Sequence, residues 1–130
     1  MARKAKTENT NRRSRKYQLT FNNPDKHKNC SHSAIKEKLE GWENMIYWCM
    51  CDEIAQTLHT HLFVQFKNPV YFSSIKKTFP VAHIEDAQGS AQDNRNYIRK
   101  EGKWEQTEKE TTNLKETFEE WGTMPQTGQG

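Results

Sequence analysis

The chain has 130 residues, of which 32% are hydrophobic and 28% charged, and its formal net charge is +3. This length supports one modest hydrophobic core and excludes a chain of several domains. Because no apolar stretch is long enough to cross a membrane and the three cysteines lack disulfide-framework spacing, we expect a soluble, intracellular, reduced protein.

Charge is distributed unevenly between the two ends of the chain. Residues 1–16 carry seven basic side chains and one acidic side chain, whereas six glutamates fall within residues 105–121. We expect residues 1–15 to form a flexible basic arm, because they show no hydrophobic periodicity. Such an arm suits a polyanion such as nucleic acid, although solvated tails commonly have the same composition.

The first half of the chain predicts two strands around a helix. Residues 16–22 alternate in polarity and predict a strand, which an Asn-Pro-Asp turn ends. Ser31 or Ser33 can cap an amphipathic helix that runs to about Trp42. Residues 45–52, MIYWCMCD, form the most apolar run and predict a central strand that pairs as a hairpin with the segment that follows.

That following segment, residues 58–66, has the sequence LHTHLFVQF. Strand side chains alternate between faces, so His59 and His61 share one face with their Cα atoms roughly 6.6 Å apart. Leu62 and Val64 belong to the opposite face, which is apolar enough to cover a core. An isolated H-x-H pair is more often ordinary surface, but it can also hold a metal ion.

The second half predicts further helices and strands. We expect a helix over residues 72–79, a strand over 81–86 and a helix over 91–100 that Ser90 and Asp93 cap. A short strand at residues 103–104 and a helix from Asn113 complete the pattern. The order predicts an α+β fold, namely a ferredoxin-like (RRM-like) antiparallel sheet with helices packed on one face and an open face carrying the site.

Glu53, His59 and His61 offer one carboxylate and two imidazoles, a set that leaves coordination positions free on a metal. Mn²⁺, Mg²⁺, Co²⁺ and Zn²⁺ all accept these ligands, so the residues alone do not name the ion. The position of Glu53 relative to the histidines depends on the hairpin register. A zinc site built from Cys49 and Cys51 with the histidines is an alternative, although its spacing is unusual for a zinc finger.

Tyr97 and Lys100 form a second pair, three residues apart on a helix with few apolar residues. A tyrosine hydroxyl can act as a nucleophile, and a nearby ammonium can stabilise the charge that develops. Most Tyr-x-x-Lys pairs are ordinary helix-surface packing. His83 is a further candidate for a site residue, although a hydrogen-bonded structural histidine is the commoner case. The chain has no P-loop, which excludes ATP hydrolysis.

Three motifs occur in a fixed order: YQLTFNNP at residues 17–24, HTHLFVQF at residues 59–66 and NYIRKEG at residues 96–102. In this order, and with Asp52-Glu53 ahead of the second motif and AHIEDAQGS ahead of the third, they resemble the HUH-endonuclease domain of rolling-circle replication initiators. These are the Rep proteins of circovirus-like (CRESS-DNA) viruses and related plasmids. The resemblance covers roughly residues 17–104.

The resemblance implies a metal-dependent, sequence-specific nicking and joining enzyme for single-stranded origin DNA. Tyr97 would form a covalent 5′-phosphotyrosine, Lys100 would assist the charge, and Glu53, His59 and His61 would hold Mn²⁺ or Mg²⁺. No nucleotide cofactor is expected in this domain. The candidates for DNA contacts are Asn22 and Asn23 from the first motif, with Arg12, Arg13, Arg15 and Lys16 from the basic arm.

The resemblance also implies an arm at residues 1–15, an endonuclease domain at residues 16–121, and a tail or linker at residues 122–130. A downstream helicase domain, a stem-loop origin as partner and a monomeric fragment are expected. The location would be a host nucleus for a eukaryotic virus, or bacterial cytoplasm for a plasmid. Two alternatives remain: a non-catalytic module that binds single-stranded nucleic acid, and a metallohydrolase with water as nucleophile.

Overall fold

The computed structural model describes residues 12–105 and 112–125. Within them, five strands form one antiparallel sheet in the order β4-β1-β3-β2-β5. The strands are β1 (Arg13–Asn22), β2 (Met45–Ala55), β3 (Thr57–Tyr71), β4 (His83–Asp86) and β5 (Asn113–Gly122). The helices are α1 (His32–Leu39), α2 (Phe72–Thr78) and α3 (Ala91–Arg99), with short 3-10 turns η2 (Pro24–Lys26) and η3 (Gly102–Trp104). The predicted α+β class with an antiparallel sheet is confirmed.

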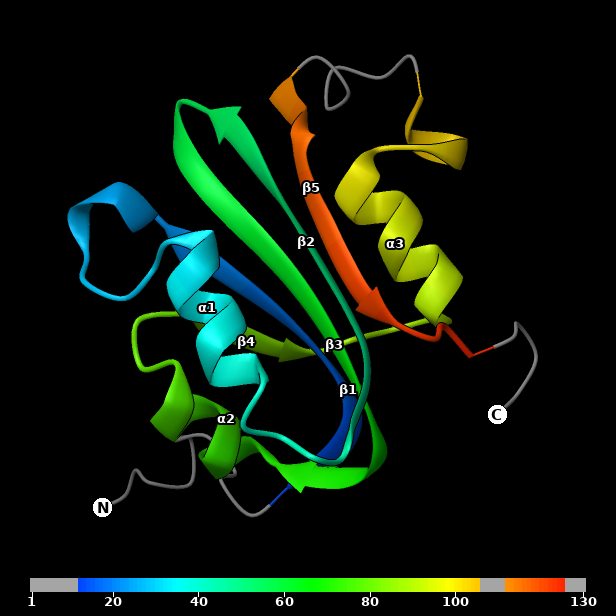
Figure 1. Cartoon of the computed structure of the whole chain (residues 1–130). Helices are drawn as coiled ribbons and strands as arrows, with labels where there is room; N and C mark the ends of the chain where they lie inside the picture. The colour runs from blue at the N-terminus through cyan, green and yellow to red at the C-terminus, as the bar shows by residue number, and fades with distance from the viewer. Residues whose placement is uncertain (1–11, 106–111, 126–130) are drawn as a thin grey trace, which may run out of the picture.

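The sheet is twisted, and helices lie on both of its sides (Figure 1). Helices α1 and α2 cover one face, where Ile35, Leu39 and Ile75 pack against Leu62 and other side chains of the strands. Helix α3 covers part of the opposite face, where Ala91 and Ile98 join a smaller cluster of buried residues. That cluster also contains Tyr47, Cys49, Cys51 and Phe63 from the strands.

The expected arrangement of helices on one face is therefore wrong in one respect. Helix α3 is poor in apolar residues, but its buried Ala91 and Ile98 lie on the histidine face of the sheet. Two apolar side chains suffice because the sheet itself supplies the buried aromatic and thiol groups beneath them. The histidine face is thus a partly covered surface rather than an open one.

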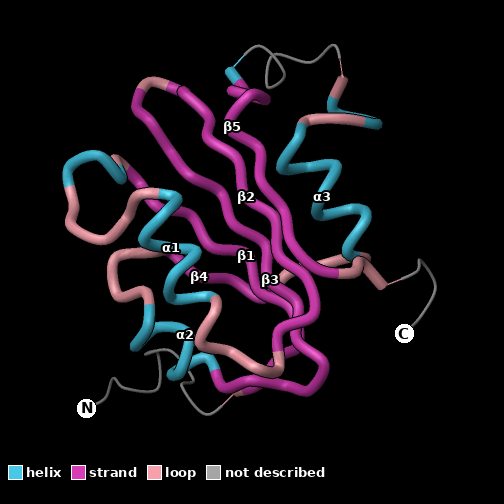
Figure 2. The backbone as a smooth tube through the Cα atoms, in the orientation of Figure 1, coloured by secondary structure: helices cyan, strands magenta, loops and turns pink. Residues whose placement is uncertain are grey.

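The prediction of a helix from Asn113 is also wrong, because this segment forms strand β5. Leu114, Phe118 and Trp121 have helical spacing, yet the segment is an edge strand that runs beside β2 (Figure 2). In the register of this pair, Trp121 lies opposite Trp48. Pairing with the apolar β2 outweighs the local helical pattern. The register shifts beside Cys51, and there the Thr117 hydroxyl accepts the Asp52 backbone N–H at 2.8 Å.

Smaller differences concern element ends. Strand β1 begins at Arg13, so the last residues of the predicted arm belong to the sheet, while residues 1–11 lie outside the described residues. Residues 103–104 form part of η3 rather than a strand. Residues 126–130 of the predicted tail also lie outside the described part. No helix in the described ranges is long and apolar enough to cross a membrane.

The two isoleucines Ile35 and Ile54 provide a matched test of this packing. Ile35 on α1 is completely buried, whereas Ile54 near the β2–β3 turn is 49% exposed. We expect Ile35→Ala to lower the free energy of unfolding by about 2–5 kcal/mol, because it leaves a cavity between α1 and the sheet. Ile54→Ala should cost about 1 kcal/mol or less. Urea denaturation followed by circular dichroism measures both, and equal losses would contradict the assigned core.

Candidate functional site

The register of the β2–β3 hairpin brings the predicted carboxylate to the predicted histidines. Glu53 lies opposite His59, and Cys51 lies opposite His61. On the other side of β3, strand β1 places Asn22 opposite His59 and Thr20 opposite His61. Residues directly opposite in an antiparallel pair share a face, so Glu53, His59 and His61 all project from the α3 side of the sheet. The two imidazole centroids are 6.3 Å apart.

The Glu53 carboxylate is buried and has several partners. His61 Nε2 donates to Oε1 at 2.9 Å, the Lys100 ammonium lies 3.6 Å from the same oxygen, and the Thr112 hydroxyl donates to Oε2 at 2.9 Å. The hydrogen bond from His61, opposed by burial and supported by the charge of Lys100, lowers the pKa of Glu53 to about 2. Glu53 is therefore a charged group at neutral pH, and its neighbours supply both cationic and neutral donors.

The chemistry of these side chains fits a divalent cation, although they do not stand as a preformed ligand set. Carboxylate and imidazole donors suit Mn²⁺, Mg²⁺ and Zn²⁺. The buried Nδ1 of His59 has no hydrogen-bond partner among the described residues, so this nitrogen is available as a donor to a cation. However, no three His, Cys, Asp or Glu side chains in the described ranges are grouped to hold an ion. Glu53 instead bonds directly to His61.

Helix α3 carries the predicted nucleophile and its cation. The helix begins at Ser90, which makes a reciprocal capping box with Asp93, and ends before Lys100, which adopts the left-handed conformation at φ 57°. This conformation turns the Lys100 side chain back under the helix, where it is fully buried. Its ammonium donates to the Tyr97 carbonyl at 2.8 Å and lies 3.8 Å from the Tyr97 ring centroid. The predicted Tyr97–Lys100 pair is thus brought together at Glu53.

Tyr97 also meets the histidine motif directly. Its ring packs edge-on against His61 at 5.8 Å between centroids and against Trp104 of η3 at 5.2 Å. Burial raises the pKa of the Tyr97 hydroxyl, and the negative charges of Glu53 and Glu85 raise it further. Tyr97 is consequently protonated at neutral pH, so any reaction at its oxygen needs an acceptor for the proton or a cation that stabilises the tyrosinate.

A cleft of about 700 Å³ opens beside Tyr97 and His61, between α3 and strands β1 and β4. Its lining includes residues that the sequence pattern did not single out, namely Gln18, Thr20, Glu85, Asn94, Asn96 and Trp104. His83, one of the weaker candidates, also lines the cleft, and its Nε2 lies 2.9 Å from Glu85. Only the folded chain brings these residues together, since they come from four separate segments, namely β1, β4, α3 and η3.

The predicted DNA-contact residues divide into two groups. Asn22 is exposed at the end of β1 beside His59, and Asn23 follows it in a left-handed conformation with its N–H bonded to the Leu58 carbonyl. Arg13 lies at the other end of β1, opposite Tyr71, roughly 30 Å from Asn22 by strand rise. The asparagines therefore lie at the site, and the start of β1 does not.

The basic residues at the start of β1 bond to the protein itself. Arg12 pairs with Asp86 at 3.3 Å and covers the Phe72 ring, Arg13 lies over Tyr71, and Arg15 donates to the Lys67 carbonyl at 3.1 Å. The ammonium of Lys16 donates to the carbonyl of Gly89, a residue that lines the cleft. Asp86, the partner of Arg12, lines the cleft as well, so Arg12 and Lys16 both reach its edge.

The cysteines do not form the alternative zinc site. Cys49 and Cys51 are buried, and burial raises both pKa values, that of Cys49 to about 12. The Cys51 thiol donates to the Leu114 carbonyl at 3.3 Å. The two thiols belong to no group of three His, Cys, Asp or Glu side chains in the described ranges that could hold an ion, and they pack beneath α3 as small apolar groups.

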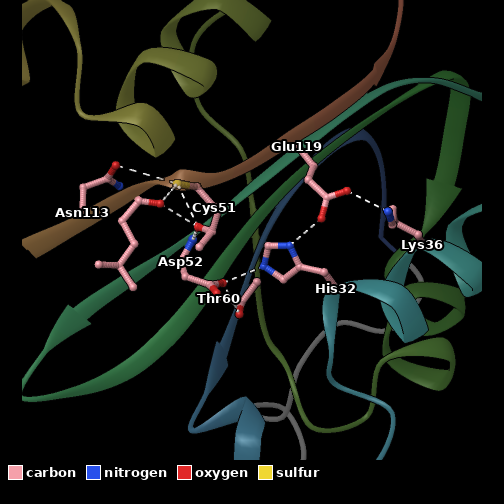
Figure 3. Close-up of polar contacts among 9 residues, drawn as sticks. His32, Lys36, Cys51, Asp52, Thr60, Asn113 and Glu119 are labelled. Carbon is pink, nitrogen blue, oxygen red and sulfur yellow. Dashed lines mark hydrogen bonds and ion pairs between the residues drawn. The ribbon is translucent and has the colours of Figure 1, made fainter.

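A polar network on the opposite face of the sheet was not predicted (Figure 3). His32, the first residue of α1, lies between two carboxylates, with Nε2 2.7 Å from Asp52 and Nδ1 2.8 Å from Glu119. Thr60 donates to Asp52 at 2.7 Å, and Lys36 donates to Glu119 at 2.7 Å. The bond to Asp52 raises the pKa of His32, despite the opposing effect of burial. The network depends on β5, which the sequence pattern predicted as a helix.

Comparison with known proteins supports a Rep-type domain. Residues 14–101 match the family described as "Putative viral replication protein", and the chain belongs to this family. A segment of 46 residues is 46% identical to the "Replication-associated protein" of Beak and feather disease virus. The match spans 35% of this chain and 16% of that protein.

His32 gives the fold a measurable pH dependence. Its pKa is raised above the ordinary value of 6.5, so its stabilising contribution is complete below about pH 6.5 and is lost as the pH rises through the folded-state value. We expect the free energy of unfolding to fall over this range in the wild type and to fall less in His32→Gln. Urea titrations at several pH values measure the difference. His27→Gln, at an exposed loop position, should retain the wild-type profile.

Proposed function

We propose that this domain nicks and rejoins single-stranded DNA at a replication origin, with Tyr97 as nucleophile and a divalent metal ion as cofactor. The observation that carries the proposal is the contact of Tyr97 with His61, whose Nε2 bonds to Glu53, at the edge of a cleft. Membership in the viral replication protein family supports a role in initiating replication. The candidate nucleophile, the candidate metal ligands and a cleft of about 700 Å³ thus lie close together.

The reaction follows from the chemistry of a tyrosine oxygen and a phosphodiester. The Tyr97 oxygen would form a bond to the scissile phosphorus while the bond from phosphorus to the 3′ oxygen breaks. The products would be a 5′-phosphotyrosine and a 3′-hydroxyl, which gains a proton as Tyr97 loses one. Attack of a 3′-hydroxyl on the phosphotyrosine would reverse the exchange, so joining requires no nucleotide cofactor.

Glu53, His59 and His61 are the residues that would hold Mn²⁺ or Mg²⁺, and the bound ion would polarise the phosphate and neutralise part of its charge. Occupancy would require the Glu53–His61 hydrogen bond to give way to bonds with the ion. Thr20 is placed to orient the imidazole, because its hydroxyl lies 3.4 Å from His61 Nδ1. The unpartnered Nδ1 of His59 is the second nitrogen available.

Lys100 would act on the nucleophile rather than on the leaving group. Its ammonium lies 3.8 Å from the centroid of the Tyr97 ring and is fully buried, so its charge is weakly screened by solvent. Burial and the charges of Glu53 and Glu85 raise the Tyr97 pKa, so a cation beside the ring would be needed to stabilise a tyrosinate. Lys100 therefore supports deprotonation of Tyr97 as the phosphate approaches.

A non-catalytic module that binds single-stranded nucleic acid is the second candidate. The lining of the cleft favours it, because Trp104 offers a ring for base stacking and the amides of Gln18 and Asn96 offer hydrogen bonds. This candidate requires neither the metal ion nor the hydroxyl of Tyr97. The catalytic proposal, by contrast, also includes a stem-loop origin as the DNA substrate and a helicase domain elsewhere in the same replication protein.

The nucleophile is tested with single-stranded oligonucleotides that carry candidate origin sequences, incubated with the protein and Mn²⁺ and analysed on a denaturing gel. We expect a covalent protein–DNA adduct that disappears in Tyr97→Phe and in EDTA. Tyr71→Phe is the matched control, because Tyr71 is exposed on β3 and lies outside the cleft. Cleavage that persists in Tyr97→Phe would indicate water as nucleophile, and binding without cleavage would favour the non-catalytic module.

The metal ligands are tested independently of cleavage. Titration of the protein with Mn²⁺, followed by the electron paramagnetic resonance signal of the free ion, should reveal one site. Glu53→Gln and His61→Ala should each weaken binding by at least about tenfold, because each removes a donor from the set. Glu40→Gln and His27→Ala, both at exposed positions, should bind as the wild type does. Unchanged affinity in Glu53→Gln and His61→Ala would contradict the assignment.

A further inference from the structure

The His32 network lies directly behind the proposed metal ligands. Asp52 precedes Glu53 on β2, and Thr60 lies between His59 and His61 on β3. Asp52 and Thr60 are opposite each other in the ladder, and their side chains are joined by a hydrogen bond of 2.7 Å. Because strand side chains alternate, this pair projects from one face of the sheet while the ligands project from the other. The two sites therefore share a short stretch of backbone.

His32 ties this stretch to two other elements (Figure 3). Its ring reaches Asp52 on β2 with one nitrogen and Glu119 on β5 with the other, and α1 supplies the ring itself. The start of α1 is held in turn by Ser31, whose hydroxyl accepts the Ala34 backbone N–H at 3.1 Å. One side chain thus connects a helix, a central strand and an edge strand at a single point.

The negative charges of Asp52 and Glu119 explain why an imidazole between them is stabilising. Asp52 on β2 and Glu119 on β5 project two carboxylates from neighbouring strands on the same face, and each lies within 2.8 Å of a nitrogen of the His32 ring. Like charges on adjacent strands repel, and a doubly protonated imidazole between them offers one N–H to each. Lys36 contacts Glu119 at the more exposed side of the network and does not reach Asp52 in the described contacts. His32 is the group that reaches both carboxylates.

We propose that His32 is a positioning residue for the metal site: by bridging Asp52 on β2 and Glu119 on β5 it fixes the stretch of β2, joined to β3 through the Asp52–Thr60 bond, that lets Glu53, His59 and His61 share one ion. The inference rests on the proposed function, because it concerns the same ligands. His32 itself touches neither the ion nor the DNA. Its loss lets the two carboxylates separate, and the displacement of Asp52 moves Glu53, the next residue along the strand.

The test is Mn²⁺ affinity, measured by the resonance signal of the free ion on variants whose fold is verified by circular dichroism. His32→Gln should bind about tenfold more weakly, the effect typical of removing an outer-shell partner. Lys36→Met is the matched control, since it removes the exposed part of the same network and should keep wild-type affinity. Adding Glu119→Gln to His32→Gln relieves the repulsion and should restore part of the affinity, which lost packing alone would not explain.

A second variant covers the case in which His32→Gln does not fold. Thr60→Val keeps the shape of the side chain and the His32 bridge but removes the bond to Asp52, and it should also weaken Mn²⁺ binding. Wild-type affinity in a folded His32→Gln, or in Thr60→Val, would overturn the inference. If the wild-type protein binds no Mn²⁺, the proposed metal site itself is refuted, and this inference falls with it. The wild-type titration therefore separates the two failures.

Discussion

The buried carboxylate of Glu53 is the constraint around which this domain is arranged. A charge removed from water is tolerated only where partners replace its hydration, and Glu53 has His61 from β3, Lys100 from the end of α3 and Thr112 from the residue before β5. These partners come from three separate segments of the chain. The same carboxylate thus holds α3 against the sheet and brings Tyr97 to the histidines.

Placing helices on both sides of the sheet makes this possible. Helices α1 and α2 cover the main core, which leaves the other face free to carry polar groups under α3. Because α3 contributes few apolar side chains, its position depends on polar contacts as much as on burial. The catalytic proposal and the position of α3 therefore rest on the same interactions, and a change at Glu53 would affect both.

Much of the site could be predicted from the sequence because its residues lie in local patterns. Alternation placed His59 and His61 on one face, and helical spacing paired Tyr97 with Lys100. The position of Glu53 required the hairpin register, which local spacing does not define. Strand β5 was predicted as a helix because Leu114, Phe118 and Trp121 recur with helical spacing, and pairing with β2 outweighs that local pattern. His32 was missed since its partners lie on strands distant in sequence.

Lys100 is a position at which the substitution that would relieve backbone strain conflicts with the charges around it. A non-glycine residue at φ 57° is strained, and glycine is the substitution that ordinarily relieves such strain. Glycine here would remove the ammonium that neutralises Glu53 and lies over Tyr97. Relief of backbone strain thus favours glycine at position 100, whereas neutralisation of the Glu53 charge requires lysine there. Stability engineering of this domain would therefore meet a trade-off with function at the last turn of α3.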